Sequence, residues 1–323
     1  MTPPPAPLAA ALADRYTLEK EIGRGGMAAV YLAERVGTGE RVALKVLNAE
    51  LARTVGADRF KREIRVAGAL DHPNILRVLD SGEVGDQLWF TMPFVAGTTL
   101  HDRLAKDGPL EVAEALRITR AVGAALAAAH AKDVVHRDIK PDNILLDGSD
   151  VLVADFGVAR AVSENAEKLT ATGMIVGTPV YMSPEQASGE KAIDGRTDQY
   201  ALASVLYEML SGEPPFKGPT PAATLMRRFA GPPRPLRPVI PVAEAVEAAI
   251  LRALDKEPDH RFATMQEFLD ALEGKVAPLP VRAAHTPVPA AAASTAVAAG
   301  KKGCAGMLLA AIGLGALLGP PRA

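Results

Sequence analysis

The chain has 323 residues and is 48% hydrophobic, which suffices to bury one sizeable core or two moderate ones. Lysine and arginine total 36 against 38 for aspartate and glutamate, so the net charge of -2 gives no electrostatic reason to expect nucleic acid as a partner. A single cysteine, Cys304, excludes an internal disulfide and fits a reducing compartment. The start, "MTPPPAPLAAALADRY", lacks the basic region of a secretory signal, so we expect a cytoplasmic N-terminal body.

The predicted elements change in type along the chain. Residues 1–14 are rich in Pro and Ala and are expected to form a flexible segment. One helix is expected at about 58–70, among short runs that predict strands. The strand segments are 16–22, 28–36, 40–47, 75–84 and 87–95, and later helices are predicted at 112–131, 195–211, 242–254 and 264–273. The order predicts a small sheet-rich lobe followed by a larger helical lobe.

The C-terminal part has no such periodicity. Residues 275–302 are rich in Pro and Ala and predict a linker. The uncharged run 303–319 would reach roughly 25 Å as a helix, which is short but usable for a membrane span. Lys301 and Lys302 before it favour a cytoplasmic linker, and 320–323 would form a short tail. The alternative is an apolar tail on a soluble cytoplasmic protein.

A glycine-rich stretch, "IGRGGMAAVYL" (Ile22–Leu32), predicts a turn between two strands. Such a turn can lie over phosphates, because glycine lets the backbone approach a ligand closely. The third glycine of the pattern G-x-G-x-x-G would stand at position 28, where this chain has Ala28. The stretch alone is therefore compatible with a nucleotide cradle or with a flexible hairpin.

Lys45 lies inside the apolar strand "VALKVL", where a buried ammonium needs a compensating anion. Glu63 is a candidate, because it falls on the same helical face as Phe60 and Ala67. The two side chains suggest a buried ion pair that could aim Lys45 at a ligand phosphate. The alternative is that Lys45 reaches the surface and Glu63 is solvated.

The strings "VVHRDIKPDNILL" and "VLVADFGVAR" carry the clearest chemistry. The turn "DGSD" between them predicts a hairpin, which would bring Asn143 beside Asp155. Their oxygen atoms suit Mg2+, which also takes phosphate oxygens. Asp138, five residues before Asn143, is placed to receive a proton from a hydroxyl. A lone Asp in a loop is usually structural or solvated, but the whole spacing H-R-D-x-K-x-x-N with D-F-G twelve residues later is specific.

Together these motifs resemble those of bacterial eukaryotic-like (Hanks-type) serine/threonine protein kinases, from about Tyr16 to Leu272. The resemblance implies an α+β, two-lobed protein kinase fold over 15–274, with an N-lobe of about 15–95 and a C-lobe of about 96–274. It further implies an enzyme that uses ATP with Mg2+ or Mn2+ to phosphorylate Ser and Thr hydroxyls of proteins.

The same resemblance assigns residues to the site. Lys45 would hold the α- and β-phosphates with Glu63 as its partner, and Asp138 would accept the hydroxyl proton. The catalytic set is Asp138, Lys140, Asn143 and Thr178, and the metal ligands are Asn143 and Asp155. The ATP-binding set is Ile22, Gly23, Arg24, Gly25, Gly26, Met27, Ala28, Ala29, Val30, Ala43, Lys45, Glu63, Met92, Pro93, Val95 and Asp155. Met92 matches the gatekeeper, and Pro93 to Val95 match the hinge that binds adenine.

The residues between Gly157 and Ser183 match the activation segment of the family. Thr170 and Thr172 match its regulatory threonines, and Arg137 could pair with a phosphothreonine. An ordinary polar loop is the alternative. The resemblance also implies structural roles: Glu185 pairs with Arg261, and Asp198 supports the catalytic loop, His136–Asn143.

Two other functions compete with that of an active kinase. A pseudokinase scaffold would be expected to lack part of the catalytic set, which is intact here, and a small-molecule kinase would not be expected to carry the activation segment. Partners implied by the resemblance are protein substrates and proteins that read phosphothreonine, and a homodimer is left open. The expected location is the cell membrane, with a single span and a cytoplasmic kinase domain.

Overall fold

The computed structural model describes residues 4–157, 180–237 and 239–275. All of them belong to one compact unit, Met1–Arg282. Thr170, Thr172 and Thr178 lie outside the described residues, as do 276–302 of the predicted linker and the predicted span 303–319. Among the helices that the structure describes, none combines the length and the apolar character that a membrane crossing requires.

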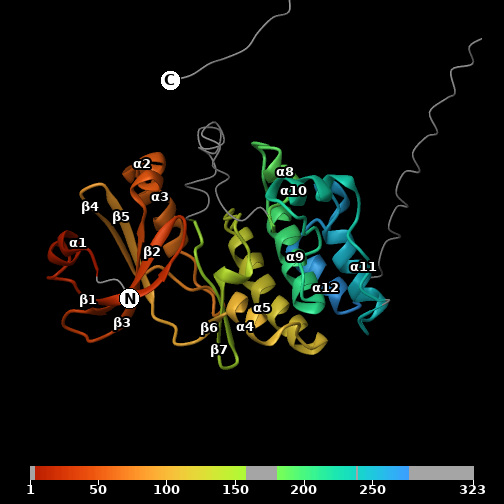
Figure 1. Cartoon of the computed structure of the whole chain (residues 1–323), viewed down its shortest axis with the longest axis horizontal. Helices are drawn as coiled ribbons and strands as arrows, with labels where there is room; N and C mark the ends of the chain where they lie inside the picture. The colour runs from red at the N-terminus through yellow and green to blue at the C-terminus, as the bar shows by residue number, and fades with distance from the viewer. Residues whose placement is uncertain (1–3, 158–179, 238, 276–323) are drawn as a thin grey trace, which may run out of the picture. The chain divides into compact units, whose positions relative to one another are not determined.

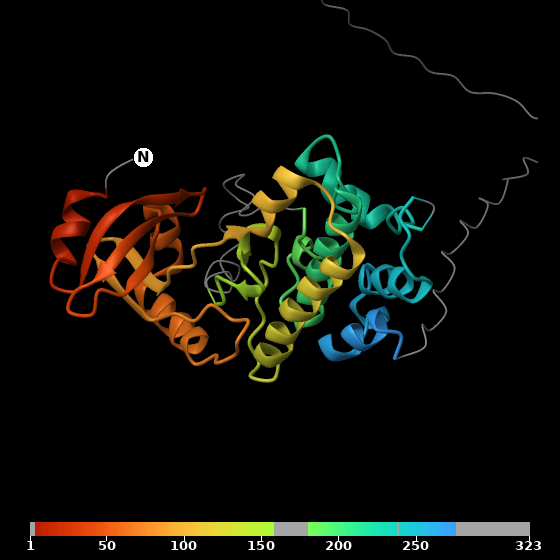
Figure 2. The ribbon, with the colours of Figure 1, turned by 90° about the horizontal axis from the view of Figure 1, so that it is seen from below.

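A five-stranded antiparallel sheet forms the N-terminal part of the fold, with strand order β1-β2-β3-β5-β4. The strands are β1 (Tyr16–Arg24), β2 (Ala28–Arg35), β3 (Arg41–Leu47), β4 (Asp80–Val84) and β5 (Gln87–Pro93). Strand β4 begins later than the predicted 75–84, because Ile75 instead bridges to Val153, which lies outside this sheet. The sheet and helices α2 and α3 gather at one end of the described fold (Figures 1 and 2).

Helices α2 (Ala49–Val55) and α3 (Ala57–Gly68) cover one face of this sheet. Asn48 begins α2 by accepting the backbone N–H of Leu51 at 2.7 Å, a contact that stabilises the first helical turn. Helix α3 buries Phe60, Ile64 and Ala67 at helical spacing, together with the side chain of Glu63. This packing turns Glu63 toward the interior.

The opposite face of the sheet is covered by α1 (Ala6–Ala11), which corrects the expectation of a flexible segment at 1–14. Leu8 is fully buried and Leu12 nearly so, packed with Tyr16, Trp89 and other apolar residues of the sheet. Burying two leucines offsets the entropy lost in ordering the segment. The Pro- and Ala-rich composition concealed this tertiary contact.

A second, three-stranded sheet and a group of helices form the rest of the described fold (Figure 1). The strands are β6 (Thr98–Thr99), β7 (Ile144–Asp147) and β8 (Asp150–Val153). The helices are α4 (Leu100–Asp107), α5 (Val112–His130), η1 (Pro141–Asn143), α8 (Pro184–Ala187), α9 (Arg196–Ser211), α10 (Pro221–Ala230), α11 (Glu244–Ala253), η2 (Pro258–His260) and α12 (Met265–Leu272). The predicted change from a sheet-rich to a helical lobe is confirmed.

The large hydrophobic core lies among α5, α9, α11 and α12. Helix α9 is buried on almost every side, and its Asp198 and Thr197 are enclosed with the apolar residues. A buried carboxylate is costly unless it is hydrogen-bonded or paired, so Asp198 must have polar partners nearby. Its partners lie in the candidate site.

Candidate active site

The glycine-rich stretch joins β1 to β2, as predicted. Asn48 holds its tip, because the Asn48 side chain donates to the carbonyl of Gly26 at 2.6 Å and its backbone N–H donates to that of Met27 at 2.9 Å. A Cβ on Gly25 or Gly26 would meet no atom of the described residues within 4 Å, so packing against them does not require glycine there. The open space and exposed backbone suit a ligand that approaches closely.

Apolar residues assigned to adenine lie close together. Ala43 and Met92 are register partners on β3 and β5. Val30 and Val95 pack against the same buried cluster, which also receives Leu145 of β7. Leu145 was missed by sequence reasoning, because only the fold brings β7 into contact with this cluster. The remaining residues of the ATP-binding set in this region lie in β1 (Ile22, Gly23 and Arg24), in the turn or β2 (Gly25, Gly26, Met27, Ala28 and Ala29) and at the end of β5 (Pro93).

The ion pair of Lys45 joins two distant parts of the chain. Its Nζ donates to Oδ2 of Asp155 at 2.5 Å, and both side chains are largely buried. Burial raises the pKa of Asp155, but the attraction and the hydrogen bond of Lys45 outweigh it, so this pKa lies below its usual range. Strand β3 is thereby tied to the segment that follows β8.

The predicted ion pair between Lys45 and Glu63 does not form within the described residues, although Glu63 is only 6% exposed. Lys45 instead compensates the buried carboxylate of Asp155, as an enclosed charge requires. Helix α3 still contacts this region, because a Cβ on Gly157 would come within 3.0 Å of the Glu63 carbonyl. Gly157 has φ of +80°, so a larger residue there would be strained in its backbone and would crowd α3.

The catalytic loop brings Asp138, Lys140 and Asn143 together. Lys140 Nζ donates to Oδ2 of Asp138 at 2.7 Å. Asn143 Nδ2 donates to the Asp138 carbonyl at 2.8 Å and to Oδ2 at 3.1 Å. The predicted hairpin is confirmed, because β7 pairs with β8 and the N–H of Ala154 donates to the Asn143 carbonyl at 2.9 Å. Asn143 therefore lies beside the residue that precedes Asp155.

These residues fit a divalent magnesium ion. Oδ1 of Asp155 is buried and has no hydrogen-bond partner among the residues that the structure describes. A buried oxygen of this kind needs a partner, and a carboxylate oxygen is a ligand that Mg2+ prefers. Since the amide nitrogen of Asn143 is occupied by Asp138, its oxygen is the atom left to bind a cation. Asp155 and Asn143 are thus the residues that would hold the metal.

Asp198 anchors the catalytic loop from α9, which confirms its predicted supporting position. Its Oδ2 accepts the backbone N–H of His136 at 2.8 Å and contacts His130 Nε2 at 2.8 Å, while Oδ1 accepts the N–H of Arg137 at 2.8 Å. Burial raises the pKa of Asp198, but these bonds and the neighbouring histidines outweigh it and lower the pKa overall. The buried carboxylate is satisfied by the loop it holds.

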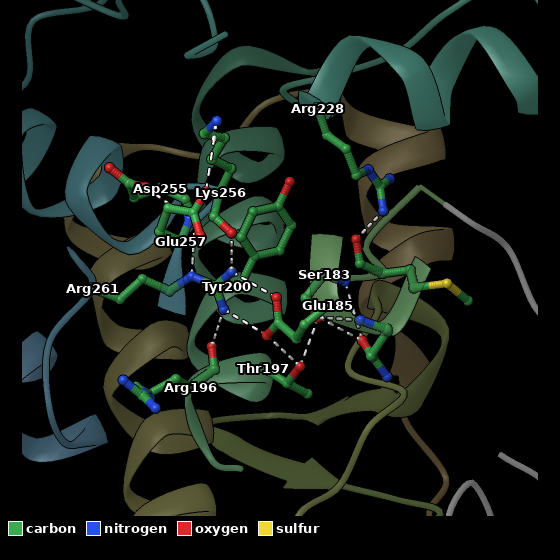
Figure 3. A network of polar contacts seen from close by, with 12 residues as sticks. Ser183, Glu185, Arg196, Thr197, Tyr200, Arg228, Asp255, Lys256, Glu257 and Arg261 are labelled. Atoms are coloured by element: carbon green, nitrogen blue, oxygen red, sulfur yellow. Dashed lines mark hydrogen bonds and ion pairs between the residues drawn. The ribbon is translucent and has the colours of Figure 1, made fainter. Parts of the chain in front are cut away.

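Glu185 and Arg261 form the predicted long-range ion pair (Figure 3). Two parallel hydrogen bonds of 2.8 Å join the guanidinium of Arg261 to the two oxygens of Glu185. Thr197 also donates to Glu185 at 2.7 Å, and the Arg261 guanidinium lies over the ring of Tyr200. Burial raises the pKa of Glu185, but the hydrogen bonds and charge of Arg261 outweigh it, so the pKa is lowered.

Two further polar side chains near the end of the activation segment were missed by sequence reasoning. Arg228 of α10 (Figure 3) is almost fully buried. It donates to the carbonyls of Met182 and Val180. Gln186 of α8 donates to the carbonyl of Arg137 at 2.8 Å. Only the capping pattern S-x-x-Q at Ser183 gave a local signal, and it indicated a helix start rather than a long-range contact.

Comparison with known proteins agrees with this geometry. The family described as protein kinase domain matches residues 16–270. The chain therefore belongs to the protein kinase family, and its described fold is the two-lobed kinase fold.

Curated relatives include bacterial serine/threonine-protein kinases. The chain is 41% identical over 263 residues to PknB of Mycolicibacterium smegmatis, covering 79% of this chain and 42% of that protein. It is 38% identical over 276 residues to pkn2 of Myxococcus xanthus, covering 83% of this chain and 33% of that protein. The chain thus spans less than half the length of these two relatives.

Solved structures with a similar fold include a bacterial kinase domain. The kinase domain of Mycobacterium tuberculosis PknI, in a mutant form, is 34% identical with a TM-score of 0.65, and the likeness covers 80% of this chain and 95% of that one. Rad53 in complex with AMP-PNP is 25% identical with a TM-score of 0.69, covering 82% of this chain and 66% of that one.

Replacing Arg261 by Met should lower the free energy of unfolding by about 3–5 kcal/mol near neutral pH, because Glu185 would stay buried without its cation. In the wild type the lowered pKa of Glu185 contributes stability above about pH 4.3, which is lost only as the pH falls through the lowered pKa. In the variant, burial without Arg261 raises the pKa of Glu185, so this side chain becomes protonated as the pH falls. The difference in the free energy of unfolding between variant and wild type should therefore be smaller at about pH 5 than at about pH 8. Urea unfolding of both proteins at the two pH values measures these free energies.

The matched control is Arg196→Met, which removes an arginine paired with the more exposed Asp194 and Asp259. That loss should be about 1 kcal/mol or less. A loss below about 1 kcal/mol for Arg261→Met as well would contradict the buried ion pair as a brace.

Proposed function

We propose that the chain is an ATP-dependent serine/threonine protein kinase, which transfers the γ-phosphate of ATP to Ser and Thr hydroxyls of proteins in bacterial signalling. The observation that carries this proposal is the contact of Lys45 with Asp155, beside the loop of Asp138 and Asn143, in a chain of the protein kinase family. The names of the bacterial relatives and the AMP-PNP bound to Rad53 support it.

In this proposal the nucleotide lies between the glycine-rich turn and the apolar cluster. The segment Ile22–Val30 covers the phosphates, while Ala43, Met92 and Val95 contact adenine and the carbonyl of Pro93 accepts its amino group. Leu145 joins this apolar surface, because it packs in the same cluster. Lys45, which pairs with Asp155 in the structure, turns from it to donate to phosphate oxygens.

The chain's own residues also prepare the acceptor hydroxyl. Asp138 accepts its proton, and the two donors on Oδ2, from Lys140 and Asn143, fix the orientation of this carboxylate. Lys140 lies beside this carboxylate. In the proposal its ammonium also stabilises the negative charge on the phosphate that is transferred to the hydroxyl. Thr178, outside the described residues, would contact the acceptor. When bound by Asn143 and Asp155, Mg2+ or Mn2+ neutralises negative charge on the phosphate oxygens.

Asp138→Asn tests this function. The change keeps the side-chain size but removes the proton acceptor, so phosphate transfer should fall about 10²–10⁴-fold while ATP affinity stays close to that of the wild type. Labelled phosphate on the protein itself and on a generic basic substrate measures transfer, and a nucleotide titration measures affinity. The control Asp150→Asn alters an exposed residue of β8 and should label normally. Equal labelling by Asp138→Asn would contradict the proposed role.

Autophosphorylation of Thr170, Thr172 or both is part of the proposal, with Arg137 as a partner for a phosphothreonine. A modified segment of this kind would also suit proteins that read phosphothreonine. The wild-type samples of the labelling experiment test it by phosphopeptide mass spectrometry of residues 158–179. A labelled basic substrate with no phosphate on this segment would refute the two sites but leave the transferase activity standing.

We also propose that 275–302 links the kinase domain, on the cytoplasmic side, to a single membrane span at 303–319. The support is the uncharged run itself, preceded by Lys301 and Lys302. Full-length protein should sediment with membranes, whereas a chain that ends at residue 300 should stay soluble. Recovery of the full-length chain in the soluble fraction would contradict the span.

A further inference from the structure

Gln186 contacts two parts of the chain at once. It lies in α8, directly after the segment that precedes Ser183. Its Oε1 accepts the backbone N–H of Ser183 at 3.1 Å, and its Nε2 donates to the carbonyl of Arg137 at 2.8 Å. The first contact belongs to the capping of α8, whereas the second reaches a residue 49 positions earlier in the chain.

The orientation of this amide follows from its partners. The backbone N–H of Ser183 can only donate, so it requires the oxygen of Gln186. The carbonyl of Arg137 can only accept, so it requires the nitrogen. A flipped amide would lose both contacts, which fixes the donor on the side of the catalytic loop.

Arg137 has an unusual backbone conformation for a residue with a side chain, with φ of +68°. Its N–H donates to Oδ1 of Asp198 at 2.8 Å, and its carbonyl accepts from Gln186. Both backbone polar groups of this residue are therefore held by side chains of other elements. Such outside contacts are what keeps a sparsely populated conformation in place.

The next peptide group carries Asp138. The carbonyl oxygen of this peptide group belongs to Arg137 and accepts from Gln186. Its N–H belongs to Asp138 and donates to His136 Nδ1 at 3.2 Å. His136 is fixed in turn, because its Nε2 contacts the Ala154 carbonyl at 2.8 Å and its ring packs edge-on against Phe156. Both polar atoms of the peptide plane that leads into Asp138 are thus restrained.

We propose that Gln186 is a positioning residue, which ties the helix after the activation segment to the peptide plane that carries Asp138. The inference rests on the proposed kinase function and adds a connection to it. If Ser183 and the start of α8 move, the side-chain amide of Gln186 moves the peptide group before Asp138 as well. Asp198 holds the N–H side of Arg137 from α9, and Gln186 holds the carbonyl side from α8.

Gln186→Glu separates the two contacts of this side chain. Glutamate keeps an oxygen for Ser183 and is a usual residue at this capping position, so α8 should form as before. It replaces the donor to Arg137 by an oxygen, which faces the carbonyl oxygen unfavourably. In the full-length protein we expect kcat for phosphate transfer to fall about tenfold or more, which corresponds to about 1.4 kcal/mol in the barrier. The KM for ATP and the midpoint of thermal unfolding should stay at the wild-type values.

Two variants complete the experiment. Gln266→Glu makes the same chemical change at an exposed position of α12 and should keep the wild-type kcat. Gln186→Met removes the donor without adding a charge and should also lower kcat with the KM for ATP unchanged. A simple contribution to folding would instead lower the unfolding midpoint and the affinity for ATP together with kcat.

The inference is overturned if Gln186→Glu keeps kcat within about twofold of wild type, a change of about 0.4 kcal/mol in the barrier. It is also overturned if kcat, ATP affinity and unfolding midpoint fall together in both Gln186 variants. Failure of the proposed kinase function and failure of the role of Gln186 give different results. A wild-type protein that transfers no phosphate contradicts the proposed function, whereas an active wild type with an equally active Gln186→Glu contradicts only the role of Gln186.

Discussion

The carboxylate of Asp198 is the constraint on which the site depends. It lies fully buried in α9, the most enclosed helix of the described fold, and it accepts hydrogen bonds from the backbone of His136 and Arg137. A left-handed conformation at a residue such as Arg137 costs about 1–3 kcal/mol, and hydrogen bonds to a charged group contribute about 1.5–3 kcal/mol each. The bonds to Asp198 are therefore strong enough to keep the loop in this conformation. The position of Asp138 therefore depends on Asp198, which holds the two preceding residues from the helical core.

Charge pairing at the other side of the site links the two lobes. Lys45 belongs to the five-stranded sheet, whereas Asp155 follows the hairpin that also carries Asn143. The pair is close because each charge would be costly alone in a largely buried place. The unpartnered Oδ1 of Asp155 then leaves, among the described residues, one strong oxygen ligand for a cation. One carboxylate can in this way contact Lys45 through Oδ2 and offer Oδ1 to a cation.

The sequence predicted the site better than its surroundings. Spacing alone placed Asp138, Asn143 and Asp155 together, because a tight hairpin leaves the chain few other paths. It failed for α1, where composition suggested a loose segment but the burial of Leu8 and Leu12 stabilises a helix. Helix α2 was also missed. Glu63 was suggested as the partner of Lys45 because it falls on the apolar face of its helix, but the partner in the structure is Asp155. The contacts of Gln186, Arg228 and Leu145 depend on elements far apart in the chain, which no local pattern encodes.

The most direct test of the central claim is phosphate transfer by full-length Asp155→Asn, measured with labelled ATP and magnesium against the wild type. Asparagine keeps the shape of the side chain but removes the charge that pairs with Lys45 and would bind the metal. We predict that the wild type labels itself and a basic substrate, while the variant loses labelling by about a thousandfold. Equal labelling of the two proteins would contradict a metal-dependent kinase site at Asp155.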